Sequence, residues 1–186
     1  MVTKPGTYLE ADESPVEFED AVAVWAPAAY GALRETATRY RATMTYKELG
    51  EAVQRQTGIR TRTTLAKWIV PVLAGVAREC IENKEPLLIA LCVTADGSVA
   101  AGYDEAVKEK YEEEPKDLDV HAAAERLNCY RFFGAELPAD GGSPVLTKQV
   151  AAKKRAAAQD RKRPTCPTCF LELPANGVCD YCVHGA

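Results

Sequence analysis

The chain has 186 residues, of which 47% are hydrophobic and 27% are charged, and its formal net charge is -4 at pH 7. This length and apolar content fit one domain of moderate size and a small additional module. No run approaches the roughly 20 consecutive apolar residues of a membrane span, and acidic residues occupy the region where a signal peptide needs an apolar core. We therefore expect a soluble, cytoplasmic protein with no membrane partner.

Residues 1–40 combine an acidic segment with a predicted helix. Residues 1–20 carry six acidic side chains and two prolines, a composition that predicts a disordered tail. Pro27 is typical of the first turn of a helix, and the apolar residues after it recur at helical spacing. This pattern predicts a helix over residues 28–40.

Two further helices are predicted before residue 82. Thr45 and Glu48 have the spacing of a capping box, and Gly58 follows the apolar stripe, so a second helix should run from Thr45 to just before Gly58. A third helix is expected from residues 63 or 64 to 81. Pro71 should kink or restart it.

A β-hairpin is predicted next. Residues 87–94 form an apolar, strand-like run, residues 95–97 have turn composition, and residues 98–101 can return as the partner strand. Three helices followed by a hairpin is the element order of a winged helix. We therefore expect a mainly α fold, a winged helix-turn-helix with a small β-hairpin, over residues 21–134.

The remainder of the chain is predicted to extend this domain and then to link it to a second module. Helices over residues 104–113 and 118–133 would cover the winged helix as its C-terminal extension. Residues 135–163 combine a loop with a basic linker helix that has almost no apolar face. Residues 164–186 form the second module.

Four cysteines in that module have the spacing of a zinc site. The pairs Cys166/Cys169 and Cys179/Cys182 are Cys-x-x-Cys motifs separated by nine residues. Four thiolates complete the tetrahedral coordination of a structural Zn²⁺ and leave no position open for catalysis. Two disulfides or a dithiol redox pair are alternatives, which a reducing cytoplasm disfavours. His184 is an alternative ligand.

The module has few apolar side chains, so metal binding would have to stabilise its fold. A short strand is expected over residues 170–173 and a turn over residues 174–177. The whole resembles a small zinc ribbon, a type of module that binds nucleic acid or docks onto protein machinery.

Basic residues gather in two blocks, which points to a polyanionic partner despite the negative net charge. Residues 34–67 hold eight basic and three acidic residues, and residues 148–163 hold seven basic and one acidic residue. Clustered Arg and Lys contact DNA phosphates, and threonines near a helix N-terminus add neutral donors. The predicted contacts with duplex DNA are Tyr46, Arg60, Arg62, Thr63, Thr64 and Lys67 in the first block, and Lys153, Lys154, Arg155, Arg161, Lys162 and Arg163 in the second. The alternatives are packing for Tyr46, solvation for the arginines, and a solubilising linker helix for the second block.

Parts of residues 44–103 are similar to a known family. The stretches 44–53, 86–89 and 95–103 resemble the winged-helix domain of alkylguanine-DNA alkyltransferases and their alkyltransferase-like relatives. The resemblance implies DNA contact by Tyr46 at a helix start and by Arg60 or Arg62 where the family inserts an arginine into the duplex.

The nucleophile motif of that family is missing. In place of Pro-Cys-His-Arg the chain has Leu88-Ile-Ala-Leu-Cys-Val93, and no His or Arg follows Cys92 to lower its pKa. We therefore expect no alkyl transfer and no enzymatic activity.

The sequence thus predicts a non-enzymatic DNA-binding protein of the cytoplasm, associated with the nucleoid. It would be a bacterial or phage regulator or accessory factor of transcription, recombination or restriction. The alternative is a protein-interaction adaptor, in which the zinc ribbon or residues 104–134 dock on a DNA- or RNA-processing enzyme. A lesion-sensing alkyltransferase relative is a third alternative.

Overall fold

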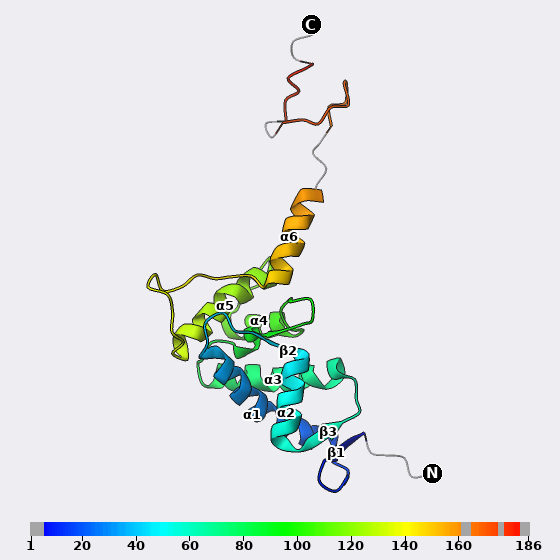
Figure 1. The fold of residues 1–186 in the computed structure, drawn as a ribbon, viewed down its shortest axis with the longest axis vertical. Helices are drawn as coiled ribbons and strands as arrows, with labels where there is room; N and C mark the ends of the chain where they lie inside the picture. The colour runs from blue at the N-terminus through cyan, green and yellow to red at the C-terminus, as the bar shows by residue number, and fades with distance from the viewer. Residues whose placement is uncertain (1–5, 161–164, 175–176, 183–186) are drawn as a thin grey trace, which may run out of the picture. The chain divides into compact units, whose positions relative to one another are not determined.

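The fold is seen in a computed structural model that describes residues 6–160, 165–174 and 177–182. It is mainly helical, and the chain divides into two compact units, residues 1–150 and 151–186. In chain order the elements are β1 (Thr7–Leu9), α1 (Phe18–Ala37), β2 (Met44–Thr45), α2 (Tyr46–Thr57), β3 (Ile59–Thr61), α3 (Leu65–Glu82), the 3-10 helix η1 (Leu88–Leu91), β4 (Cys92–Val93), α4 (Tyr103–Tyr111), α5 (Leu118–Phe132) and α6 (Lys148–Asp160) (Figure 1). Among the described residues, no helix has the length and apolar content needed to cross a bilayer.

The N-terminal segment is ordered from residue 6, which corrects the prediction of a disordered tail to residue 20. β1 pairs antiparallel with β3, and Tyr8 lies opposite Arg60. Thr7 Oγ1 donates to Thr61 Oγ1 at 3.1 Å. A partner strand elsewhere in the chain satisfies the backbone of this segment, so its acidic composition does not keep it unfolded. Residues 1–5 of the predicted tail lie outside the described residues.

α1 begins at Phe18 and continues through Pro27, whereas the sequence predicts a start at residue 28. A proline inside a helix removes a hydrogen bond and costs about 3 kcal/mol. Burial offsets this cost, because Trp25 is fully buried and its ring lies 4.6 Å from that of Trp68 on α3. Phe18 packs edge-on against Trp25 at 6.4 Å.

The second and third predicted helices are present, and α1 packs against both (Figure 1). The capping box of α2 is complete: Thr45 Oγ1 accepts from the Glu48 N–H at 3.2 Å, and Glu48 Oε2 accepts from the Thr45 N–H at 2.7 Å. Gly58 ends this helix in the left-handed conformation, with φ 69°. α3 passes through Pro71 as one continuous helix.

The predicted β-hairpin is largely absent. Residues 88–91 form η1, and β4 pairs in parallel with β2 instead of with residues 98–101. A single antiparallel bridge joins Val93 to Val99. The winged helix therefore stays a prediction.

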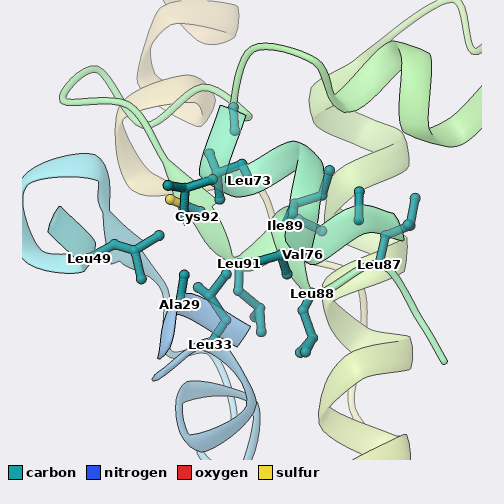
Figure 2. Close-up of a cluster of buried hydrophobic side chains, with 14 of the residues drawn as sticks. Ala29, Leu33, Leu49, Leu73, Val76, Leu87, Leu88, Ile89, Leu91 and Cys92 are labelled. Atoms are coloured by element: carbon teal, nitrogen blue, oxygen red, sulfur yellow. The ribbon is translucent and has the colours of Figure 1, made fainter. Parts of the chain in front are cut away.

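The predicted hairpin strand does not form because residues 87–92 are buried on all sides. Every side chain from Leu87 to Cys92 is buried, and Figure 2 shows Leu88 and Leu91 among side chains of α1, α2 and α3. A run with no solvent-exposed face has no need of the alternation of a hairpin strand, and the 3-10 turn directs successive side chains into the core.

The two predicted covering helices are present as α4 and α5. Asp117 caps α5, since its Oδ1 accepts from the Val120 N–H at 3.2 Å. Two buried charged residues connect α5 to the η1 region: Glu125 Oε1 accepts from the Leu87 N–H at 2.7 Å, and Arg126 Nη1 donates to the Ala90 carbonyl at 3.1 Å. The two charged side chains thus join α5 to the core through backbone groups.

Candidate functional site

The four cysteines of the second unit form one cluster. Their Sγ atoms all lie within 4.8 Å of one another. Cys166 Sγ lies 3.6 Å from Cys182 Sγ, and Cys169 Sγ lies 3.4 Å from Cys179 Sγ. Thiolates bound to zinc at about 2.3 Å in a tetrahedron are separated by about 3.8 Å, so this arrangement fits a metal site. The sulfurs are too far apart for the disulfide alternative, which requires about 2.05 Å.

The backbone around Cys166 supports ionised sulfur. The N–H groups of Cys169 and Thr168 donate to its thiolate and lower the pKa of Cys166 to about 6. Hydrogen bonds that the Cys182 thiol donates to the neighbouring sulfurs, led by Cys169, instead raise the pKa of Cys182 to about 12. A dication would let all four sulfurs ionise together, because its charge offsets their mutual repulsion.

The chain around the cysteines folds through turns with little strand. Instead of the predicted strand over 170–173, one antiparallel bridge joins Thr165 to Glu172. Phe170 has φ 58°, which breaks the extended conformation. Across the predicted turn, the Gly177 N–H donates to the Pro174 carbonyl at 2.9 Å, and residues 175 and 176 between them lie outside the described residues. His184, the alternative ligand, lies outside the described residues.

Most residues of the first basic block that are predicted to contact DNA lie on β3, on the segment that leads to α3, or in the first turn of α3. Arg60 lies in β3, and its Nη2 lies 2.8 Å from Glu10 Oε1. The exposed Arg62 guanidinium lies 4.2 Å from the ring centroid of Tyr8. Lys67 is exposed in the first turn of α3. We call Arg60, Arg62, Thr63, Thr64 and Lys67 the α3 entrance.

The threonines of the α3 entrance shape the chain locally. The Thr63 N–H donates to Thr61 Oγ1 at 3.1 Å. Thr64 is the N-cap residue of α3, and its side chain makes no capping hydrogen bond. The hydroxyl of Thr64 is therefore not committed to the helix N-terminus.

Tyr46 is not part of the α3 entrance, because it lies at the start of α2. It is half-buried, and its hydroxyl accepts from the Ala101 N–H at 2.8 Å. Burial raises the pKa of Tyr46. The Tyr46 hydroxyl thus accepts a hydrogen bond within the helical unit, in line with the packing alternative, and the DNA contact by Tyr46 stays a prediction.

Sequence reasoning missed Tyr8 and Glu10, which contact the two arginines of the α3 entrance. The signal for them was weak. Thr7 and Tyr8 are residues of high β propensity, but the three-residue run 7–9 is too short to predict a strand without its partner.

The second basic group lies on α6. Lys153 and Arg155 are exposed, and Lys154 is half-buried. The predicted contacts Arg161, Lys162 and Arg163 lie outside the described residues.

The thiols of the first unit are buried. Cys92 is inaccessible, and burial raises its pKa. Burial also raises the pKa of Cys80 to about 11 and that of Cys129 well above its usual range. A nucleophilic cysteine needs access and a lowered pKa, and these three thiols have neither.

No protein-family model, curated protein or solved structure matches the chain. Any function assigned to it therefore rests on its own residues and their geometry.

Proposed function

We propose that this protein is a non-enzymatic, duplex DNA-binding regulator or accessory factor with a structural zinc site. The α3 entrance carries this proposal. Arg62 and Lys67 are exposed beside the N-terminus of an 18-residue helix, and Arg60 precedes them on a paired strand. Cations and a helix N-terminus both favour phosphate.

The cations of the α3 entrance are carried by ordered backbone, which favours DNA binding. β3 is paired with β1, and α3 is anchored by the buried side chains Trp68, Ile69 and Val72. Because the backbone that carries the α3 entrance is already ordered, DNA binding would need to order little more than the arginine and lysine side chains.

The second unit would add phosphate contacts. α6 exposes Lys153 and Arg155, and the zinc would hold the fold of residues that have few buried side chains. Zinc enters this proposal as a structural ion, because four cysteine ligands leave no position for a substrate.

The test is a titration of the zinc-loaded protein with a fluorescent DNA duplex at several salt concentrations. Phosphate contacts predict that the logarithm of the affinity falls linearly with the logarithm of salt concentration, with a slope of about -0.9 for each contact. A protein that binds no duplex at low salt, or binds with no salt dependence, would contradict the proposal.

A second candidate is the protein-interaction adaptor. It is favoured by the aromatic side chains of Phe170 and Tyr181 in the second unit, which are 78% and 79% exposed. Exposed aromatic residues are typical of binding surfaces. On α5, Val120 and Phe132 are also exposed. The adaptor would show no binding to bare duplex, so the same titration separates the two candidates.

A further inference from the structure

The first unit contains a cavity of about 340 Å³ that none of the proposed functions uses. Its walls come from residues 40–45, from Val93 and Thr94 after η1, from α5 and from residues 143–149. Its volume is within the usual range of small-molecule sites, which begins at about 300 Å³.

The cavity has an unbalanced positive charge. Arg41, Arg126 and Lys148 line it, and none of the described residues that line it is acidic. Arg126 is 4% exposed. Within the described part of the chain no carboxylate lies at ion-pair distance from Arg126. Its guanidinium donates to the carbonyls of Ala90 at 3.1 Å and Val145 at 3.3 Å.

A buried guanidinium without a carboxylate is unusual, because a buried charge is costly unless it is paired. The two carbonyl dipoles offset only part of the positive charge of Arg126, so an anion could offset the rest. Burial lowers the pKa of Arg126, as expected for a cation that has lost its water. The N-terminus of α6, which begins at Lys148, adds a further preference for negative charge.

The walls of the cavity are held in place without a ligand. Tyr40 and Tyr130 pack edge-on at 5.6 Å, and the Tyr130 hydroxyl donates to the Ala42 carbonyl at 2.7 Å. The Ser143 N–H donates to the Tyr40 hydroxyl at 3.1 Å. These contacts fix the two aromatic rings and the start of the segment 143–149.

Gly97 holds the segment 143–149 near its C-terminal end, at Thr147. The Thr147 hydroxyl donates to the Gly97 carbonyl at 2.8 Å. Gly97 has φ 80°, and a Cβ atom there would come within 2.6 Å of Thr147 Oγ1, so only glycine allows this approach. The cavity is thus built by ordered contacts between distant parts of the chain.

We infer that this cavity binds a small organic phosphate monoester, with its phosphate at Arg126 and its apolar or aromatic body against Tyr40 and Tyr130. Three lining cations match a dianion better than a monocarboxylate, and guanidinium groups bind phosphate through paired hydrogen bonds. The depth of Arg126 favours a free ester over a phosphate of a duplex backbone. Binding of such an ester does not depend on DNA binding by the α3 entrance.

The experiment uses NMR on the zinc-loaded, full-length ¹⁵N-labelled protein. Phenyl phosphate and AMP are the probes, and adenosine and benzoate are compared with them. We expect saturable shifts at the Arg126 side-chain N–H and at the backbone of residues 143–149 for the two phosphates, and at least about tenfold weaker binding of adenosine and benzoate. The assignment is overturned if neither phosphate gives saturable shifts at millimolar concentration, or if adenosine or benzoate binds equally well.

Variants then test the role of the charges. Arg126→Met removes the central cation but can destabilise the core, so Arg41→Met combined with Lys148→Met is the second variant, because both side chains are exposed at the cavity. Each variant should weaken phenyl phosphate about tenfold or more. Arg39→Met combined with Lys47→Met removes two exposed cations that do not line the cavity, and should leave binding unchanged. Equal effects of the two double variants would overturn the proposal.

Discussion

Glu10 Oε1 lies 2.8 Å from Arg60 Nη2, so an acidic residue of the N-terminal segment is paired with an arginine of the α3 entrance. DNA phosphate and Glu10 would compete for the same guanidinium. The partners reach each other because β1 and β3 are paired, with Tyr8 opposite Arg60.

This pairing predicts that Glu10→Gln strengthens DNA binding. An exposed ion pair is worth up to about 1 kcal/mol, so the gain in affinity should be at most about fivefold. It is measured by anisotropy titration against a fluorescent duplex. Glu35→Gln removes an equal charge from α1, where Glu35 faces Arg39 at 3.9 Å, and should change affinity less. Equal gains in both variants would show a general charge effect.

Charge reversal at the α3 entrance should reduce DNA affinity. Arg62→Glu with Lys67→Glu removes two exposed cations at the proposed contact. We expect the salt slope to become shallower by about 2, one for each lost phosphate contact. The control, Lys108→Glu with Lys116→Glu, reverses two exposed charges elsewhere in the helical unit. If the control loses as much affinity, the contact lies outside the α3 entrance.

Zinc removal should unfold the second unit and leave the first unit folded. The four-cysteine cluster predicts one Zn²⁺ per chain by metal analysis. Cys179→Ser should release the ion, whereas Thr168→Ser should retain it, because Thr168 supplies a backbone donor and no ligand. Circular dichroism after chelation should keep most of the helical signal. A zinc-free protein with dispersed amide resonances from residues 165–182 would contradict this prediction.

Glu125 should be a major determinant of stability. Its carboxylate accepts from the Leu87 N–H at 2.7 Å, the Tyr111 hydroxyl at 2.5 Å and Asn128 Nδ2 at 3.0 Å. Glu125→Ala leaves buried donors without a partner, so the free energy of unfolding should fall by about 2–5 kcal/mol in a urea titration. Glu109→Ala changes an exposed residue of α4 and should alter stability by less than about 0.5 kcal/mol.

Alkaline pH should destabilise the first unit through Tyr130. Burial raises the pKa of Tyr130 to about 12, from an ordinary value near 10. A raised pKa means that the folded state favours the protonated phenol. The associated stability is therefore complete below pH 10 and is lost as pH rises toward 12.

Thermal unfolding measured between pH 9 and pH 12 checks this dependence. Tyr130→Phe should make the fall in stability over this interval smaller, since it removes one of the titrating groups. Cys80 and Tyr30, whose pKa values burial raises to about 11 and about 12, still contribute to the fall. Tyr181→Phe, at an exposed side chain of the second unit, should leave the fall unchanged. An identical pH profile for wild type and Tyr130→Phe would refute the assignment.

Local sequence patterns were sufficient where the interacting groups are close along the chain. The Thr45/Glu48 capping box and Gly58 mark the ends of α2 as predicted, because each motif acts within one or two helical turns. The spacing of the four cysteines likewise predicted their cluster, since two tight turns bring each pair to one side of a site.

Long-range packing decided the rest. Pro27 predicts a helix start, but burial of Trp25 extends α1 backward to Phe18. Burial on all sides turned residues 88–91 into η1 instead of a hairpin strand. These outcomes depend on which distant surfaces cover a segment, and hydrophobic periodicity carries no information about that.

The Glu10–Arg60 pair and the cavity beside Arg126 have the same origin. Their members are separated by 50 residues in the first case, and in the second they come from segments as distant as residues 41 and 148. Charge composition showed that Arg and Lys are concentrated in two blocks, but it could not show which of them meet a carboxylate. That outcome belongs to the packed fold, because the energy between two charges depends on their separation in space and on how much water surrounds them.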